Sequence, residues 1–357
     1  MCIGCTQNDL SSNLDNPSLH NNSSFPLGTA VRFKPFQKDA QLRRLQQHHF
    51  DSYTAGSDMK MNQVMPTEGR FDFSIVDSII AYAEEHNQRV FGHNLVWHSS
   101  TPEWVRQKAK QNPKWLLPFL KGYIQSYVGR YKGKVHGWDV VNEGLNTKGA
   151  GFRTDTIWYE TIGLEYIEKA FEYAHEADPD AILFYNDFNI ERDLEKFNTM
   201  IEMVQDFQKR GVPISGIGFQ MHIRMDIPND IIAYTLKTAA ETGLQIHLSE
   251  LDIIFNTHDD TRGGGIERYA EITPEMLVAQ AKKYEELVKI YMTTVPKDQQ
   301  YGITFWGFND RDTWIRRFFK MRDWPTIYDE NLKPKPAFYG FLEGLKSNQI
   351  SSKSNLN

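Results

Sequence analysis

The sequence predicts an α/β protein built as a single (β/α)8 TIM barrel. Eight short β-rich runs alternate with longer amphipathic stretches through the body of the chain, residues 25–346. Several runs are continuously apolar, as expected for parallel strands whose two faces are both buried. No long Gly-, Ser- or Pro-rich linker interrupts the alternation. One domain is therefore the better interpretation.

The β-rich runs define the predicted strands. They are residues 27–32, 52–55, 89–97, 135–142, 181–186, 216–220, 245–250 and 301–308. Eight strand and helix units over roughly 320 residues fit a barrel better than a doubly wound sheet, which seldom repeats so regularly. In such a barrel, the chemistry belongs at the carboxyl ends of the strands.

The segments between these runs have the apolar spacing of helices. One such segment has this spacing at Ile75, Ile79, Ile80 and Ala83. A second predicts one helix over Tyr159–Glu176, with helical spacing at Phe171, Ala174 and His175. The sequence Asp178-Pro179-Asp180 stops that helix, because proline cannot continue the backbone hydrogen bonds.

Composition limits the classes of partner. The formal net charge is -6 and the pI is near 6.0, so there is no general attraction to phosphate backbones and nucleic acid is not an expected partner. The two cysteines, Cys2 and Cys5, lie at the N-terminus, which leaves the body without a disulfide or a thiolate metal site. No apolar run is long enough to cross a bilayer.

Both ends of the chain are polar. Residues 1–24 and 347–357 are rich in Ser and Asn and are predicted to be disordered. Cys5, followed by this polar stretch, resembles the lipid-attachment site and tether of an exported bacterial lipoprotein at the cell surface or in the periplasm. The alternatives are secretion without an anchor, or a leader without a function.

Polar and aromatic side chains gather where the predicted strands end. Glu143 follows the fourth strand directly, and Glu250 ends the seventh. A lone strand-end glutamate more often forms a structural salt bridge, but two that face each other across a barrel mouth suit another role. Glycosidases use one carboxyl group as acid/base and a second on the anomeric carbon, and a separation of about 5 to 5.5 Å gives retention.

The motifs around these glutamates resemble those of glycoside hydrolase family 10, whose best-known members are endo-β-1,4-xylanases. Trp138-Asp139-Val140-Val141-Asn142-Glu143 resembles the acid/base motif, and Leu248-Ser249-Glu250-Leu251-Asp252 resembles the nucleophile motif. Further matches are Gly92 to His98, Phe184 to Asp187, Gly216 to His222, Phe305 to Gly307 and Lys333 to Ala337. The similarity covers the body from about Phe25 to Leu345, and it implies a xylan or related β-glycan as substrate.

The resemblance implies a role for each matched polar residue. Glu143 would be the acid/base, and the negative charge of Glu250 would favour its protonated form. Glu250 would be the nucleophile, oriented by His222. Asn142 would donate a hydrogen bond to the 2-hydroxyl of the sugar that is being cleaved.

Other matched residues are expected to form the walls of the sugar site. Those on the side before the scissile bond are Lys60, His93, Trp97, Gln220, Trp306 and Trp314. Any single Trp is more often part of a core, and Trp314 matches by spacing alone. Tyr185 and Asn186 either line the leaving-group side or have structural roles. No metal-ligand spacing is present in the sequence, and the mechanism needs no cofactor.

One loop departs from the family pattern. After the second strand the family carries Glu and Asn, which hold the second sugar from the cut on the non-reducing side, and this chain has Gly56 and Ser57. Either Asp58 or water supplies the missing hydrogen bonds to ordinary xylan, or the space accepts a branched xylan, a mixed β-1,3/1,4-linked xylan or another β-glycan. A catalytically silent carbohydrate-binding protein is the remaining alternative.

Overall fold

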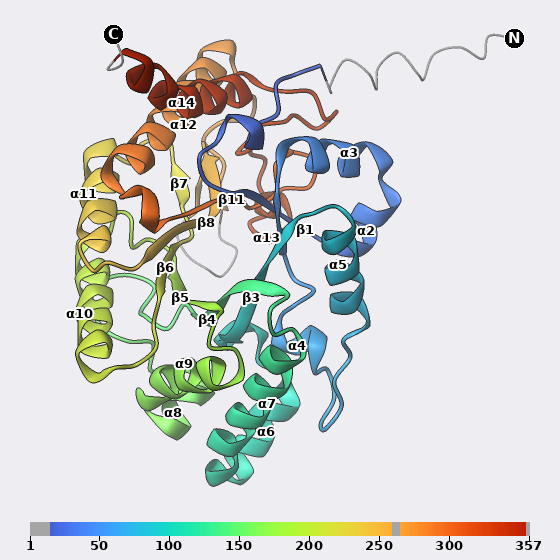
Figure 1. Cartoon of the computed structure of the whole chain (residues 1–357), viewed down its shortest axis with the longest axis vertical. Helices are drawn as coiled ribbons and strands as arrows, with labels where there is room; N and C mark the ends of the chain where they lie inside the picture. Colours follow the sequence, from blue (N-terminus) through green and yellow to red (C-terminus); the bar gives the residue numbers. More distant parts are fainter. Residues whose placement is uncertain (1–14, 259–264, 355–357) are drawn as a thin grey trace, which may run out of the picture.

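The computed structural model describes residues 15–258 and 265–354, and its centre is a closed barrel of eight parallel strands (Figure 1). In order around the barrel they are β1 (Leu27–Val31), β2 (Ser52–Ala55), β3 (Arg89–Trp97), β4 (Val135–Asn142), β5 (Ile182–Asp187), β6 (Gly216–Phe219), β8 (Gln245–Ile254) and β11 (Gln300–Phe305). Pairing of β11 with both β1 and β8 closes the ring, which confirms the predicted (β/α)8 barrel.

Among the described residues, three short strands lie outside the ring. β7 (His222–Arg224) pairs with the carboxyl end of β8. β9 (Thr257–His258) and β10 (Gly265–Ile266) form an antiparallel pair after β8.

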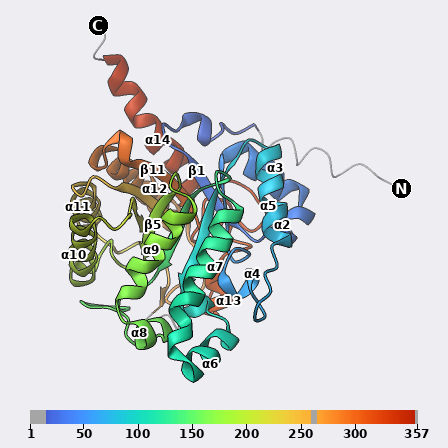
Figure 2. The same ribbon diagram turned by 60° about the horizontal axis from the view of Figure 1, so that its bottom comes forward.

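Helices surround the barrel, and two views show them as an outer layer (Figures 1 and 2). They are α2 (Phe33–Lys38), α3 (Ala40–His49), α4 (Met61–Val64), α5 (Ser74–Glu85), α6 (Glu103–Gln111), α7 (Leu116–Arg130), α8 (Ile157–Ile162), α9 (Glu165–Ala177), α10 (Leu194–Arg210), α11 (Asn229–Ala240), α12 (Pro274–Thr294), α13 (Trp314–Phe318) and α14 (Pro336–Ser354). Figure 2 shows α7 and α9 packed side by side, and α12 packs along α14. No helix in the described ranges is long and apolar enough to span a membrane.

Local sequence explains where the helices begin and end. The side chains of Asp193 and Thr273 accept hydrogen bonds from the first turns of α10 and α12, which is the usual N-cap. α10 ends at Gly211, whose left-handed backbone suits glycine. Inside the barrel, Phe184 packs against the backbone of Gly216, where an added Cβ would lie 2.2 Å from the ring. These local interactions determine where the helices end and how the strands pack, and the positions of the site residues depend on both.

The prediction of one helix over Tyr159–Glu176 was wrong. The segment forms α8 and α9, because Gly163 between them adopts a φ of 80° that breaks the helix. Phe171 and Ala174 face the core, but His175 is exposed. The stop at Asp178 is confirmed, since α9 ends at Ala177.

The ordered body extends beyond both predicted boundaries. Leu19, placed in the leader of residues 1–24, is fully buried, and the 3-10 helix η1 (His20–Asn22) that follows it contacts α3 and α14. At the other end, α14 continues to Ser354, although a disordered tail was predicted from Ser347. Burial of Phe341 and Leu345 anchors that helix. Cys2 and Cys5, with the predicted lipid anchor, lie outside the described residues.

Candidate active site

The predicted glutamates meet at the carboxyl end of the barrel. Trp97, Asn142 and Asn186 are in register on neighbouring strands β3, β4 and β5, so their side chains converge. Glu143 is the next residue after β4, and its φ of 58° is uncommon for a residue with a Cβ. Its backbone is held there by a hydrogen bond from Glu143 N to the carbonyl of Asn186, 2.9 Å.

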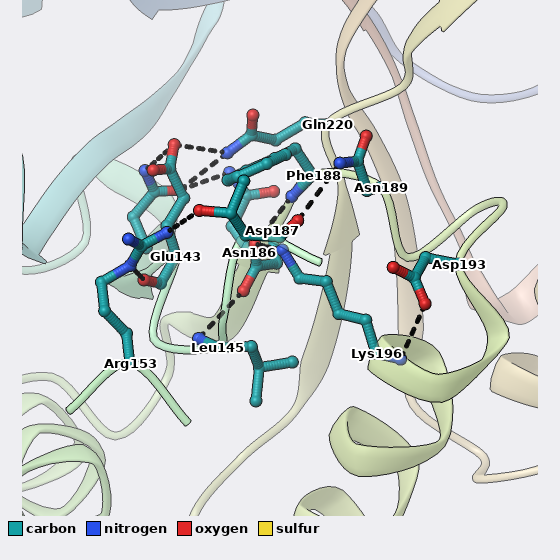
Figure 3. A network of polar contacts seen from close by, with 12 residues as sticks. Glu143, Leu145, Arg153, Asn186, Asp187, Phe188, Asn189, Asp193, Lys196 and Gln220 are labelled. Carbon is teal, nitrogen blue, oxygen red and sulfur yellow. Dashed lines mark hydrogen bonds and ion pairs between the residues drawn. The ribbon is translucent and has the colours of Figure 1, made fainter. Parts of the chain in front are cut away.

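Three side chains donate to the carboxylate of Glu143. Trp97 Nε1 donates to Oε2 at 2.9 Å. Gln220 Nε2 donates to Oε1 at 3.1 Å (Figure 3). Asn142 Nδ2 is 3.3 Å from the same Oε1. Glu143 itself is half-buried, so a leaving group or water can reach it.

Glu250 is buried, with 4% of its surface exposed, and is held on both oxygens. Asn186 Nδ2 donates to Oε1 at 2.9 Å, and His222 Nε2 lies 3.2 Å from Oε2. Burial alone raises the pKa of Glu250, but His93, the hydrogen bond and charge of His222, and the charge of Lys60 outweigh it and lower that pKa. The carboxylate is therefore kept ionised, as a nucleophile requires.

The protonation of His222 depends on a second carboxylate, that of Asp252. Its Nδ1 lies 2.9 Å from Asp252 Oδ2, which also accepts a 2.8 Å hydrogen bond from Trp314 Nε1. Burial alone lowers the pKa of His222, but Asp252 and Glu250 outweigh it and raise that pKa to about 10. A protonated His222 donates to both carboxylates at once. Asp252 was part of the quoted motif but was not predicted as a site residue.

Asn186 connects the two glutamates. Its Nδ2 donates to Asn142 Oδ1 at 2.8 Å as well as to Glu250, and its own Oδ1 accepts from Ser249 Oγ at 2.6 Å. Gln220 also reaches Asn142 Oδ1, at 3.4 Å. We name this connected set the catalytic floor: Asn142, Glu143, Asn186, Gln220, His222 and Glu250.

The walls contain His93, Trp306 and Lys60. His93 Nδ1 is 2.7 Å from Asp139 Oδ2, and its ring lies 5.0 Å from that of Trp306. Burial raises the pKa of Asp139 to about 6, although its hydrogen bond with His93 opposes this. Lys60 Nζ lies 4.4 Å from the ring of Trp97. Burial lowers the pKa of Lys60, while Glu250 and Glu143 oppose this.

Tyr185 does not join these residues. Asn186 and Phe184 point into the barrel, so Tyr185 between them points outward and is fully buried. Its hydroxyl donates to Asp187 Oδ2 at 2.6 Å. Asp187 in turn pairs with the buried Lys196, 2.7 Å away (Figure 3). Of the two alternatives for Tyr185, the leaving-group side or a structural role, these contacts favour the structural role, because strand side chains alternate between faces.

The loop with Gly56 and Ser57 opens one side of the site. Both residues line a cavity that also borders Trp306 and Trp314. Asp58 does not replace the missing hydrogen bonds freely, since its Oδ2 accepts from the backbone of Phe33 at 2.8 Å. Within residues 15–258 and 265–354, no three His, Cys, Asp or Glu side chains are grouped in a way that could hold a metal ion.

Comparisons with known proteins identify the family of this chain. The sequence model described as Glycosyl hydrolase family 10 matches residues 18–344. An endo-beta-1,4-xylanase, Xyn10C of Cellvibrio japonicus, is 36% identical over 98% of this chain and 61% of its own length. An endo-1,4-beta-xylanase of Geobacillus stearothermophilus is 38% identical over 89% of this chain and 94% of its length.

Solved structures give the same result. A variant of the Cellvibrio japonicus xylanase 10C in complex with xylopentaose matches with a TM-score of 0.87 and 36% identity, over 93% of this chain and 70% of the other. Xylanase 10B of Thermotoga maritima matches with a TM-score of 0.84 and 33% identity, over 94% of this chain and 99% of the other. The chain spans 61% and 31% of the lengths of two curated relatives, Xyn10C and xylanase C of Paenibacillus barcinonensis.

Proposed function

The chain belongs to glycosyl hydrolase family 10, and from this premise we propose that it is an endo-1,4-β-xylanase that retains anomeric configuration. The observation that supports it best is the asymmetry of the two glutamates. Glu250 is buried and held ionised, whereas Glu143 is half-buried and accessible. This is the division that double displacement needs: one carboxylate attacks and the other exchanges a proton with the leaving group and water.

In the first step, Glu250 attacks the anomeric carbon while Glu143 gives its proton to the leaving glycosidic oxygen. The carbon–oxygen bond to the leaving sugar breaks, and a bond to Glu250 forms. In the second step, Glu143 takes a proton from water, whose oxygen displaces Glu250. Asn186 and His222 hold Glu250 in one orientation through both steps.

Asn142 contributes at the 2-hydroxyl of the sugar that is being cleaved. Its Oδ1 is occupied by Asn186 and Gln220, which leaves its Nδ2 turned toward the site beside Glu143. A hydrogen bond from Nδ2 to the sugar strengthens as the ring gains oxocarbenium character. Trp97, Trp306 and Trp314 supply flat walls for the ring, and Lys60 adds a positive charge between two of them.

The substrate follows from the relatives. They include several endo-1,4-β-xylanases, and two structures similar to this chain hold xylopentaose and xylobiose. A 1,4-linked xylan backbone is therefore the proposed substrate. A decorated xylan is the second candidate, favoured by the cavity beside Gly56 and Ser57.

A product profile tests this proposal. The full chain and Glu250→Ala are incubated with linear xylan, mixed-linkage xylan, decorated xylans and cellulose. Short xylo-oligosaccharides from linear xylan, first released as the β-anomer in NMR spectra, are expected from the unmodified chain alone. Initial release of the α-anomer contradicts retention. Rates equal to those of Glu250→Ala on every glycan would leave a carbohydrate-binding protein.

The location of the protein stays a prediction from the sequence. We propose export to the bacterial cell surface or periplasm with a lipid on Cys5, since Cys5 precedes a polar stretch of tether-like composition. Incorporation of labelled palmitate that is lost in Cys5→Ala supports this proposal. Equal labelling of both proteins contradicts it.

A further inference from the structure

A cavity of about 240 Å³ lies beside the site, at the carboxyl ends of β1, β2 and β11. Trp306 and Trp314 form the wall that it shares with the catalytic floor, and Gly56 and Ser57 form another wall. Three arginines also border it: Arg32, Arg311 and Arg317. Pockets for drug-sized ligands measure roughly 300–1,000 Å³, so this cavity has room for one sugar ring rather than a chain.

The space comes from side chains that are small, not from an unusual backbone. A Cβ built on Gly56 would meet only backbone atoms of Val31, at 3.7 and 3.9 Å, which are ordinary contacts. A larger residue therefore fits at position 56. Gly56 and Ser57 stand where the family pattern has Glu and Asn, and this resemblance implies that the cavity opens beside the second sugar on the non-reducing side of the cut.

The charges around the cavity do not balance. Arg311 is paired with Asp39 at 2.8 Å and Asp312 at 3.2 Å. Arg317 Nη2 donates to the main-chain oxygen of Asp312, at 3.0 Å. Within the described part of the chain, neither Arg32 nor Arg317 has a carboxylate within 4.0 Å that would form an ion pair. Three guanidinium groups thus face two carboxylates.

Arg32 and Arg317 also act on each other, although they lie far apart in the sequence. Burial first, and then the positive charge of Arg32, lower the pKa of Arg317, while the negative charge of Asp312 opposes this. Both side chains are exposed and line the same cavity, and an anion bound between two such positive charges relieves their repulsion. Arginine binds carboxylates with two parallel hydrogen bonds, which adds orientation to charge.

We propose that this cavity binds an acidic branch of the xylan, a uronic acid on the second sugar before the cut, whose carboxylate is held by Arg32 and Arg317. The inference rests on the proposed xylanase function. A neutral branch such as arabinose would fill the same space but would gain nothing from the two arginines.

The test compares four oligosaccharides with the same xylose backbone: unbranched, with one uronic acid branch, with the methyl ester of that branch, and with an arabinose branch. The full chain is compared with Arg32→Gln and Arg317→Gln. Each variant is expected to lower kcat/KM on the acidic substrate about 10- to 100-fold, the effect of a lost hydrogen bond to a charged group. It is expected to change kcat/KM on the unbranched substrate less than about twofold. Lys34→Gln removes an exposed positive charge near Arg32 that does not line the cavity, and it is the matched control.

Mass spectrometry of the products locates the branch. From glucuronoxylan, the unmodified chain is expected to release fragments whose branch lies on the second sugar from the new reducing end. The inference is overturned if the unmodified chain cleaves the ester and the acid equally well, if it prefers the arabinose branch to the acidic branch, or if the branch lies on another sugar. No cleavage of any xylan overturns the proposed function itself, whereas cleavage of linear xylan without a preference for the acid overturns only the branch site.

Discussion

The catalytic floor and the cavity beside it are built in opposite ways. Every carboxylate oxygen of Glu143 and Glu250 has a donor within 3.3 Å, and Asn186 connects the two residues. Across Trp306, Gly56 and Ser57 leave open space, and the nearby arginines are only partly neutralised. The contrast teaches that the chemistry is fixed by a closed network on rigid strand ends, while the choice of substrate is left to loop positions that tolerate change.

If the catalytic floor acts as a unit, replacing Glu250, the proposed nucleophile, should have the largest effect. Glu250→Gln keeps the shape of the side chain but removes the attacking charge, and kcat on xylan should fall on the order of 10⁵-fold. Steady-state release of reducing sugar measures this. Glu202→Gln, on the exposed face of α10, is the control and should leave kcat unchanged. More than 1% of residual activity would be incompatible with a nucleophilic Glu250.

The second prediction distinguishes the role of Glu143 from the role of Glu250. Glu143→Gln removes the proton donor, so kcat on xylan should fall about 10²- to 10⁴-fold. An aryl xyloside with a nitrophenolate leaving group needs no proton, and its burst of phenolate should be kept. Rapid-mixing measurements on both substrates check this. An equal loss in the burst and on xylan would argue against Glu143 as the acid.

The third effect concerns the charge that holds the floor together. Because the pKa of His222 in the folded state, about 10, exceeds its unfolded value of about 6.5, protonated His222 stabilises the fold fully below about pH 6.5. That stabilisation, on the order of a few kcal/mol, is lost as the pH rises through about 10. Urea unfolding between pH 6 and pH 10 measures it.

Two variants test whether His222 causes this pH dependence of stability. His222→Gln should show a smaller fall in stability over this range than the unmodified chain, whereas the exposed His175→Gln should follow the unmodified chain. Parallel pH curves for the unmodified chain and His222→Gln would show that another group causes the loss.

The sequence predicted the strands that carry the catalytic floor better than it predicted the contacts between side chains. Three predicted strands, 52–55, 89–97 and 135–142, match the structure residue for residue, because β-rich runs alternate with amphipathic stretches in this part of the chain. The contacts of His222 with Asp252, and of Asp187 with Lys196, depend on the folded arrangement, and neither pair follows a sequence pattern. The helix break at Gly163 was missed because glycine alone does not show which φ it adopts.

The fourth prediction concerns Gly56 and Ser57 in the loop after β2, where the expected change in kcat/KM is smaller. Replacing Gly56 by Glu and Ser57 by Asn restores the polar groups of the family pattern and fills the cavity. kcat/KM on linear xylan should rise about fivefold, the gain from about 1 kcal/mol of new hydrogen bonding. Gly56→Ala adds volume without a polar group and should give no gain. A loss of activity on linear xylan in the double variant would show that the rim is not an independent part of the site.

The smallest effect on catalysis is expected at Tyr185, which separates structure from chemistry within one strand. Tyr185→Phe removes the hydroxyl that donates to Asp187, and Asp187 keeps Lys196 and the backbone N–H of Phe188. The free energy of unfolding should fall by about 1 kcal/mol, the typical value of one hydrogen bond. kcat/KM on xylan should change less than about twofold, because the side chain points away from the floor. Asn186→Ala, one residue along the strand, removes the hydrogen bonds that link the two glutamates. It should lower kcat, with a smaller change in KM. If Tyr185→Phe weakened turnover as much as Asn186→Ala, the outward face of β5 would also belong to the catalytic machinery.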